Sequence, residues 1–244
     1  MTTPEIIFVV PYRNRELQLF FFRKHMKYIL EDYDESSYEI LYIHQNDERS
    51  FNRGAIKNIG FLVIKNRYPD TYENITIVFN DIDTMPIQKN FFDYKTTKGT
   101  IKHFYGFTFT LGGILSITAG DFEMVNGFPN FWSWGYEDND LQRRALLANL
   151  TIDRSHFYPI FDKNIIFLQD GFIRIVNEDE KKRHDWKTDE GIQDITHLQY
   201  TQEKDVYHVS HFLTGTTENK NRNRAYDLRG KNQPFKRAGM KMFF

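Results

Sequence analysis

Residues 75–83 read Ile-Thr-Ile-Val-Phe-Asn-Asp-Ile-Asp, an apolar run that ends at two acids, and this stretch decides the fold. The run at residues 75–79 predicts a buried strand whose carboxyl end carries Asp81 and Asp83. Because the two acids are two residues apart on an extended chain, they share one face. Carboxylate oxygens suit divalent cations, although acids at strand ends are also common in turns. We expect Asp83 to bind a metal ion and Asp81 to serve a ribose or a metal-bound water.

The rest of the chain alternates between strand and helix patterns. Apolar runs predict further strands at residues 6–11, 38–44 and 112–116. Asn14 is the expected N-cap of the first helix. Apolar residues at helical spacing predict helices at residues 15–30, 52–66, 121–126 and 138–149. This order of elements predicts an α/β fold with a mixed, mostly parallel sheet flanked by helices.

Length and composition predict a single domain. The 244 residues are 40% hydrophobic, which is enough for one sizeable core. Within the domain 1–244 we expect a nucleotide-binding half at residues 5–110 and an acceptor and metal half at 111–218. A basic tail at 219–244 is expected to order over bound ligand. The mixed charges of residues 178–190 predict a solvated loop or an exposed helix face.

Charge and cysteine content restrict the partners and the compartment. The 32 basic and 33 acidic residues leave a formal charge of -1, so no overall field attracts nucleic acid. No stretch reaches the ~18–20 apolar residues of a membrane span, so we expect no anchor and no integral membrane segment. The chain has no cysteine, which excludes disulfides and suits a reducing compartment. A cytoplasmic protein is the resulting expectation.

Polar segments follow the predicted strands and are expected to converge on one crevice at the carboxyl edge of the sheet. Arg13 and Arg15 follow the first strand. Their guanidinium groups can hold phosphate or base oxygens, or they are two solvated arginines that open a helix. Phe51 and Arg53 can bracket a uracil ring, or Phe51 packs in the core.

Residues 126–140 read Asn-Gly-Phe-Pro-Asn-Phe-Trp-Ser-Trp-Gly-Tyr-Glu-Asp-Asn-Asp, which is too polar and too rich in Gly and Pro for a core element. We interpret this segment as a binding loop in which Trp134 contacts a sugar. Glu137, Asp138 and Asp140 precede a predicted helix, whose N-terminal dipole keeps carboxylates ionised and able to accept protons. These acids cap the helix, act in catalysis, or do both.

His208 and His211 are the expected remaining ligands of the metal. Separated by three positions, they share a face if their stretch is helical or turn-like. Each histidine is otherwise a surface residue or a satisfied core residue. A metal held by one carboxylate and a diphosphate lacks one or two ligands, and imidazole suits manganese or zinc.

Five motifs in matching order over residues 6–150 resemble the β-1,4-galactosyltransferase family, glycosyltransferase family 7 of the GT-A fold. Residues 11–15, Pro-Tyr-Arg-Asn-Arg, are similar to the family's Pro-Phe-Arg-Asn-Arg. Residues 51–53 match its Phe-Asn-Arg, and the Asp-Ile-Asp of residues 81–83 is similar to its Asp-Val-Asp. Residues 112–115 are similar to the Gly-Gly-Ile-Leu of its xylose-acceptor branch. The loop at 126–138 is similar to its Asn-Gly-Phe-Pro-Asn and Trp-Gly-Gly-Glu-Asp.

The resemblance implies a manganese-dependent inverting transferase, with magnesium also possible. Such an enzyme moves galactose or a related hexose from a UDP-sugar to a hydroxyl of a glycan, glycolipid or glycoside. By this resemblance Asp83 binds the metal, Asp138 is the base, and Trp134 contacts sugar. The donor-binding residues implied or expected are Pro11, Arg13, Arg15, Phe51, Arg53, Asp81, Lys102 and Gly113. Glu137 and Asn139 are further expected acceptor-binding residues.

Departures from the family pattern leave more than one function open. Asn139 replaces an aspartate of the family, which favours a catalytically weak carbohydrate-binding protein as an alternative. Thr110 stands where galactose-transferring members often have tyrosine, so UDP-N-acetylgalactosamine is an alternative donor. His211 follows Glu137 by 74 residues, a longer interval than in the family, which implies an insertion.

Two wider interpretations concern the origin of the chain and a different chemistry. The anchor and disulfides of the family's Golgi members are absent, which suggests a bacterial or viral enzyme. A metal-dependent phosphohydrolase that uses Asp81 and Asp83 is a further hypothesis, but it leaves the Trp134 loop unexplained.

Overall fold

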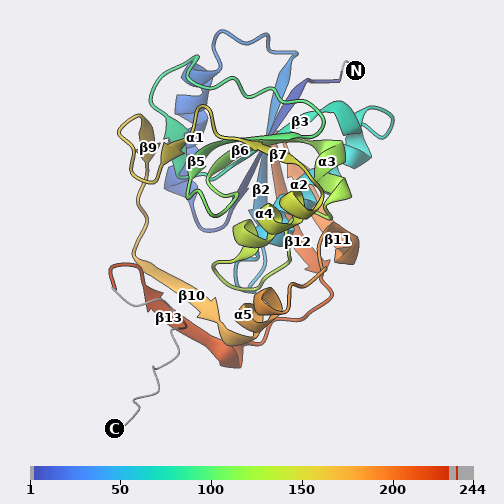
Figure 1. Ribbon diagram of the computed structural model, residues 1–244, viewed down its shortest axis with the longest axis vertical. Coiled ribbons are helices and arrows are strands. Elements are labelled where there is room, and N and C mark those ends of the chain that lie inside the picture. The colour runs from blue at the N-terminus through green and yellow to red at the C-terminus, as the bar shows by residue number, and fades with distance from the viewer. Residues whose placement is uncertain (1–2, 231–234, 236–244) are drawn as a thin grey trace.

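The computed structural model describes residues 3–230 and 235, and Figure 1 shows a central sheet with helices packed around it. The strand order of the main sheet is β11-β12-β2-β1-β3-β6-β5-β7, and β8 pairs with β5. Four neighbouring strands are parallel: β12 (Val206–Leu213), β2 (Tyr38–Gln45), β1 (Ile6–Tyr12) and β3 (Thr76–Asn80). Also parallel to β5 (Thr100–Gly106) are β7 (Thr151–Asp153) and β8 (Tyr158–Pro159). Antiparallel pairs join β6 (Ile114–Thr118) to β3 and β5, and β11 (Thr196–Glu203) to β12, so the predicted mixed, mostly parallel sheet is confirmed.

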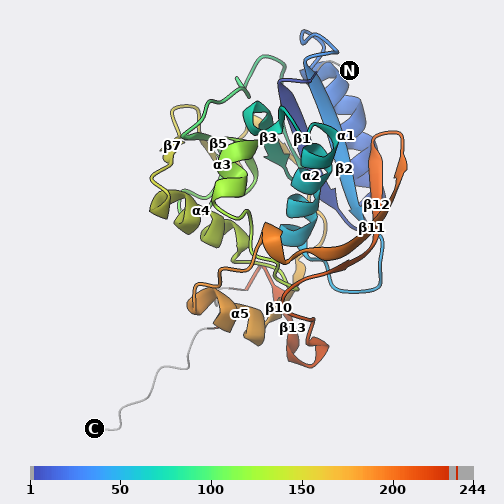
Figure 2. The same ribbon diagram turned by 90° about the vertical axis from the view of Figure 1, so that its right-hand side faces the viewer.

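Strand β1 is buried on both faces, which is why its sequence is a continuous apolar run rather than an alternating one. Ile7 and Val9 pack into a core cluster with α2 (Arg53–Arg67), α3 (Ala119–Met124) and α4 (Glu137–Leu147). Phe8 and Val10 face a second cluster with α1 (Glu16–Ile29). Figure 2 shows α1 on one side of the sheet and α2 and α3 on the other. Helices therefore cover both faces, as predicted.

The helices after β1 and β2 begin in different ways. α2 begins after Asn52, whose side chain accepts a hydrogen bond from the backbone N–H of Ala55 at 2.9 Å. α1 has Arg15 at its N-cap position and no side-chain cap. Asn14 has a φ of 50°, a left-handed conformation that asparagine tolerates better than most residues. The prediction of Asn14 as N-cap is therefore wrong, because Asn14 makes the turn that leaves β1.

The strand predicted at residues 112–116 begins two residues later, at Ile114. Gly112 and Gly113 form the turn before it, and Gly113 has a φ of 76°. A Cβ atom on Gly112 would overlap Oδ2 of Asp138. Because Gly112 has no side chain, the carboxylate of Asp138 at the start of α4 can approach the backbone of this turn. A residue with a Cβ atom at position 112 would prevent this approach.

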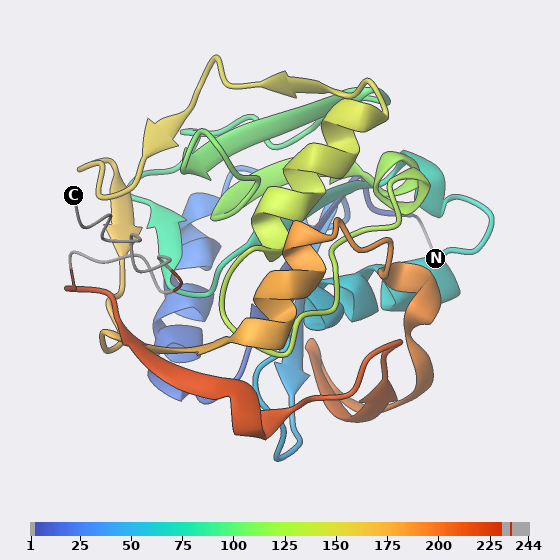
Figure 3. The ribbon, with the colours of Figure 1, turned by 60° about the horizontal axis from the view of Figure 1, so that its bottom comes forward.

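The last third of the chain adds strands that the sequence did not predict. The β11–β12 hairpin extends the main sheet beyond β2 (Figure 2). A separate two-stranded sheet pairs β10 (Ile173–Asn177) with β13 (Asn223–Asp227), next to α5 (Glu178–Asp185), as Figures 1 and 3 show. Another short pair joins β4 (Thr84–Pro86) to β9 (Ile165–Phe167). The 3-10 helices are η1 (Tyr72–Asn74), η2 (Ile192–Asp194) and η3 (Lys220–Arg222).

Two predictions for this region are corrected. Residues 178–185 form α5, whose cap Asn177 accepts from the backbone N–H of Asp179 at 2.9 Å. Glu180 on this helix is only 2% exposed, so the segment is not simply a solvated face. Part of the predicted tail, residues 223–227, is β13 and is held by backbone pairing to β10. Residues 231–234 and 236–244 of that tail lie outside the described residues.

The first turns of α2 lie against the loop at residues 126–130. A Cβ atom on Gly54 would overlap the carbonyl oxygen of Pro129. Asn58 donates to the carbonyl of Phe128 at 2.7 Å and accepts from the backbone N–H of Phe128 at 3.0 Å. These contacts position the start of α2 and the Trp134 loop relative to each other.

Gly54→Ala is expected to lower the free energy of unfolding by about 1–3 kcal/mol or more, because the added methyl group collides with main-chain atoms that cannot move freely. Urea unfolding followed by circular dichroism measures this change. Gly215→Ala is the control, since its Cβ atom would meet side-chain atoms of Glu190 at 3.3 Å or more. Equal stabilities of the two variants would contradict the close approach of α2 to Pro129.

Candidate active site

A cavity of about 330 Å³ opens at the carboxyl ends of β1 and β3, next to the Trp134 loop. The structure brings together nine residues of the predicted site along its walls: Pro11, Arg13, Arg15, Phe51, Arg53, Asp81, Asp83, Trp134 and Glu137. Strand β10 supplies a further wall with Ile173, Arg174 and Ile175, which the sequence did not point to. Two distant motifs, the acid pair at residues 81–83 and the loop that carries Trp134 and Glu137, therefore share one cavity. Asp138 does not line this cavity but contacts Arg53, which does.

Several other predicted residues do not line this cavity. Lys102 on β5 donates to the carboxylate of Asp93 at 2.7 Å. The amide of Asn139 donates to the carbonyl of Phe109 at 3.3 Å. Gly113 accepts from the backbone N–H of Asp81 at 3.1 Å, so it supports the acid pair from behind. These geometries give Lys102, Asn139 and Gly113 no contact surface in the cavity.

The structure does not bring His208 and His211 to the acid pair. Both residues are on β12, which β2 and β1 separate from β3. Because the stretch is a strand rather than a helix or turn, side chains three positions apart point to opposite faces. Nδ1 of His208 lies 3.0 Å from Nδ1 of His44, while His211 is exposed. Across residues 3–230, no three His, Asp or Glu side chains form a group that could hold a metal ion.

Arg53 is the centre of a buried ion network. Its Nη2 lies 2.6 Å from Oδ1 of Asp81, and its Nη1 lies 2.6 Å from Oε1 of Glu137 and 3.0 Å from Oδ2 of Asp138. Burial lowers the pKa of an arginine, but the charges of Asp138, Asp81 and Glu137 outweigh it and raise the pKa of Arg53 well above its usual value. One guanidinium group thus joins the end of β3, the start of α2 and the start of α4.

Lys57, one turn further along α2, is a second cation of this network. Only 1% of its side chain is exposed, and its Nζ lies 3.1 Å from Oδ1 of Asp138 and 4.0 Å from Oδ1 of Asp81. Burial alone raises the pKa of Asp138, but Arg53 and Lys57 outweigh it and lower that pKa. Asp138 therefore stays ionised.

Sequence reasoning missed Lys57. Its position in the sequence could have indicated its burial. Lys57 is the one cation in the run Gly-Ala-Ile-Lys-Asn-Ile-Gly at residues 54–60. The other residues of this run are typical of a buried helix face. A lysine at such a position is rarely buried unless an acid pairs with it. The partner acid lies 81 residues later in the chain, which periodicity does not show.

Asp83 is the acid without a paired cation. Among the residues that the structure describes, no side chain forms a hydrogen bond or ion pair with its carboxylate, although its backbone N–H and the more distant charges of Arg53 and Arg15 lower its pKa. Burial, followed by the charge of Asp81, raises the pKa of Asp83 to about 6. Among the described residues, the side chains that pair with Asp81, Glu137 and Asp138 are two cations, the partly buried Arg53 and the buried Lys57, and neither pairs with Asp83. This excess of acid fits a divalent cation with Asp83 as one oxygen ligand.

The Trp134 loop is shaped by two left-handed residues, Gly135 with a φ of 102° and Tyr136 with a φ of 75°. The backbone N–H of Trp134 donates to the carbonyl of Ile175 at 2.8 Å, which attaches the loop to β10. The indole ring is 41% exposed and stacks on Tyr226 of β13, with ring centroids 6.2 Å apart. An aromatic face therefore stands at the cavity wall, available to an amphipathic ligand.

Comparison with protein families matches two adjoining models to most of the chain. Residues 1–95 match the N-terminal region of glycosyl transferase group 7, and residues 97–164 match a model described as the N-terminal domain of galactosyltransferase. Beta-1,4-galactosyltransferase 4 of Mus musculus is 32% identical over 161 residues, which are 61% of this chain and 44% of that protein. Xylosylprotein 4-beta-galactosyltransferase of Caenorhabditis elegans is 31% identical over 156 residues, or 60% and 52% of the two chains. The chain spans about half the length of the curated relatives it matches.

Solved structures show the same fold. The catalytic domain of Drosophila beta1,4galactosyltransferase 7 in complex with xylobiose superposes with a TM-score of 0.64 and 21% identity, covering 88% of this chain and 95% of that one. A variant of the same Drosophila enzyme, in complex with manganese, UDP-Gal and xylobiose, gives a TM-score of 0.65 at 21% identity over the same shares. The predicted GT-A fold is thereby confirmed.

The origin and compartment expected from the sequence are wrong. The relatives described above are animal β-1,4-galactosyltransferases, from mouse and nematode, rather than bacterial or viral proteins. The cytoplasmic expectation relied on the absence of a signal, of a membrane span and of cysteine, and none of these absences fixes a compartment. Within the described part of the chain, the helices are too short or too polar to cross a bilayer.

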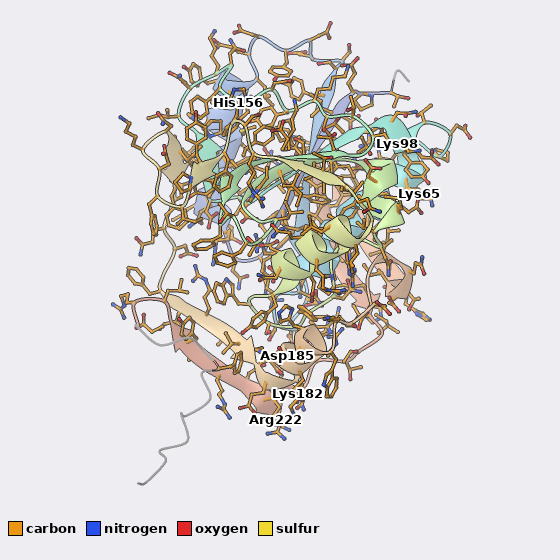
Figure 4. The ribbon with its side chains drawn as sticks, viewed as in Figure 1. Lys65, Lys98, His156, Lys182, Asp185 and Arg222 are labelled. Carbon is orange, nitrogen blue, oxygen red and sulfur yellow. The ribbon has the colours of Figure 1, made fainter. Side chains whose placement is uncertain are left out.

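Lys57→Met is expected to lower the free energy of unfolding by about 3 kcal/mol, because it leaves the partly buried Asp138 with one cation fewer. Lys65→Met is the matched control on the same helix. Lys65 pairs with Glu123 while 42% exposed, and Figure 4 shows it at the edge of the molecule. An exposed pair of this kind contributes at most about 1 kcal/mol. Chemical denaturation of both variants at pH 7 measures the difference, and a smaller loss for Lys57 than for Lys65 would exclude the buried network.

Asp83→Asn is expected to stabilise the metal-free protein at pH 7.5. Since the pKa of Asp83 is raised to about 6 in the folded protein, its ionisation favours the unfolded chain above that pH. The gain is roughly 1–3 kcal/mol and disappears as the pH falls through 6 toward 4. Thermal unfolding at several pH values in the presence of a chelator measures it. Asp70→Asn, at an exposed position, serves as control, and a gain for Asp83→Asn that does not depend on pH would contradict the assignment.

Proposed function

The chain belongs to the β-1,4-galactosyltransferase family, glycosyltransferase family 7, and on that premise we propose that it transfers galactose from UDP-galactose to a hydroxyl of a sugar acceptor. One observation carries the proposal. A single cavity joins an acid pair at a strand end to an exposed indole, and Arg53 in its wall contacts the partly buried carboxylate of Asp138, which stays ionised. These are the parts that a nucleotide-sugar transferase needs for donor, acceptor and base.

The donor side of the cavity suits a uridine diphosphate. Phe51 and Arg53 line the wall next to the acid pair, and Arg13 and Arg15 follow the end of β1. A partly exposed aromatic ring can pack on a base, and guanidinium groups bind phosphate oxygens. Arg13 lies 3.2 Å from Asp47, and Arg15 lies 2.5 Å from Asp170. These acids hold the two arginines in position, and a bound nucleotide would interact with the same guanidinium groups.

Manganese fits the acidic wall through Asp83, and magnesium is the alternative ion. The solved Drosophila variant in complex with UDP-Gal also contains manganese, which supports this choice. When bound, such an ion offsets the negative charge of the leaving diphosphate. His208 and His211 do not supply the remaining ligands in this geometry, so the diphosphate and water are left to complete the coordination.

Asp138 is the proposed base. Its Oδ1 contacts Lys57 and its Oδ2 contacts Arg53, and both contacts favour the ionised carboxylate. The proton of the acceptor hydroxyl passes to Asp138 while the acceptor oxygen bonds to C1 of galactose and the bond from C1 to the diphosphate breaks. A single displacement of this kind inverts C1 and needs no covalent enzyme intermediate.

We assign Trp134 and Glu137, which both line the cavity, to the acceptor side. An exposed indole binds the apolar face of a sugar, and carboxylates accept hydrogen bonds from sugar hydroxyls. Xylobiose is bound by the Drosophila structures, and a short glycoside is therefore the first acceptor to test. Thr110, 8% exposed in the loop that contacts Asp138, keeps UDP-N-acetylgalactosamine as an alternative donor because its side chain is small.

The geometry of the site weighs against a weak carbohydrate-binding protein and against a phosphohydrolase. Asn139 favoured the first of these, but its amide is turned to Phe109 and not to the cavity. A phosphohydrolase would use Asp81 and Asp83 together, whereas both oxygens of Asp81 contact Arg53. Neither function accounts for the ionised Asp138 beside the Trp134 loop.

Asp138→Asn is expected to lower the rate of galactose transfer at least 100-fold, because the variant lacks the proton acceptor, while UDP-galactose binding is kept. The assay uses UDP-galactose, manganese and a panel of xylosides and N-acetylglucosaminides, with chelator as the negative control. UDP-N-acetylgalactosamine is run in parallel to decide the donor. Asp70→Asn should transfer at the wild-type rate. Equal rates for Asp138→Asn and the wild type would remove Asp138 from its role, and wild-type protein that transfers no sugar to any acceptor would exclude the function.

A further inference from the structure

Arg174 lines the cavity and, among the described residues, has no carboxylate within ion-pair distance. The other cavity arginines are paired. Arg53 contacts three acids, Arg13 lies 3.2 Å from Asp47, and Arg15 lies 2.5 Å from Asp170. A partly buried cation without a paired carboxylate in a ligand cavity is costly unless a ligand supplies the opposite charge.

The position of β10 places Arg174 between the two halves of the site. Just before the strand, the backbone N–H of Leu168 donates to the carbonyl of Asp83 at 2.7 Å. At its middle, the carbonyl of Ile175 accepts from the backbone N–H of Trp134 at 2.8 Å. The segment therefore spans from the metal-binding wall to the acceptor loop, and Arg174 lies on that path.

The charges of two other cavity arginines, Arg15 and Arg53, act on Arg174. Burial, and then the charge of Arg15, lower the pKa of Arg174, whereas Asp83 and Asp170 raise it. Arginine nevertheless remains protonated, so neighbouring guanidinium groups repel one another. The guanidinium group of Arg174 is suited to an anion with several oxygens, such as a diphosphate, which would offset this repulsion.

The Arg174 side chain is held in place by its own turn. Its Nη1 lies 3.3 Å from the carbonyl oxygen of Asp170, 3.4 Å from that of Gly171 and 3.2 Å from that of Ile173. Within residues 3–230, no acceptor is provided for Nε and Nη2. The free edge of the guanidinium fork is the part that binds phosphate oxygens in pairs.

We propose that Arg174 binds the diphosphate of the nucleotide-sugar donor and stabilises it as the leaving group. This inference depends on the proposed function. When the bond between C1 of galactose and the diphosphate oxygen breaks, its electron pair stays on that oxygen. Arg174 donates hydrogen bonds to the phosphate oxygens and keeps its protons, so it offsets charge without acting as an acid. The positive charge of Arg174 on β10 would thus act on the leaving diphosphate together with a metal ion bound at Asp83.

The test measures the binding of UDP and of uridine by isothermal titration calorimetry at fixed manganese. Arg174→Met is expected to weaken UDP binding roughly 10- to 100-fold, because hydrogen bonds to a charged ligand are lost. Uridine binding should not change, since uridine has no phosphate. Arg174→Lys should fall between, as a lysine keeps the charge but not the fork.

Arg222→Met is the matched control. Arg222 lies in η3 next to β13, is 53% exposed and pairs with Glu178, so the variant loses the same charge at the far end of the small sheet (Figure 4). Its UDP affinity should equal that of the wild type. Thermal unfolding of all variants confirms that each is folded before titration.

The outcomes separate this inference from the proposed function. Unchanged UDP affinity in Arg174→Met would overturn the inference while leaving the transferase intact. An equal loss of UDP and uridine affinity would also overturn it, because Arg174 would then act only by shaping β10. Wild-type protein that binds UDP but transfers no sugar would remove the proposed function and leave the diphosphate contact standing. Wild-type protein that binds neither UDP nor pyrophosphate would remove both.

Discussion

Arg53 holds three segments of the chain together, and the rest of the site depends on that buried ion network. Its guanidinium group contacts Asp81 after β3 and both Glu137 and Asp138 at the start of α4. Without this cation the three carboxylates would repel one another in a poorly solvated place. The network can form only because α2 comes close enough, and Gly54 leaves no side chain between α2 and Pro129.

The network also gives the acids of the site different pKa values. Asp138 has two cations beside it and is ionised, whereas Glu137 has a raised pKa because of burial and the neighbouring Asp138. Asp83 is paired with neither cation, and burial together with the charge of Asp81 raises its pKa. Similar carboxyl groups thus differ in pKa, because two cations outweigh burial at Asp138, whereas burial and a neighbouring carboxylate dominate at Glu137 and Asp83. The proposed roles of base and cation ligand depend on this difference.

The C-terminal strands complete the cavity. β10 is attached to the Asp83 wall at one end and to Trp134 at the other, and β13 pairs with it and places Tyr226 on the indole. Figure 3 shows this small sheet crossing the open end of the main sheet next to α5. The hairpin that carries His208 and His211 lies instead beyond β2. The wall that faces the acids is therefore made by an arginine and isoleucines, and not by histidines.

The sequence by itself determined the order of strands and helices from β1 to β3, the acid pair after β3, the Asn52 cap and the character of the Trp134 loop, because each depends on neighbours within a few residues. It did not determine the turn at Asn14, where the backbone takes a left-handed conformation, or the strand state of residues 206–213. Only the tertiary structure decided that Lys57 lies under Asp138 and that Arg174 reaches the cavity. Those positions depend on how distant segments pack and pair, and local periodicity carries no information about which charge will face which across a core.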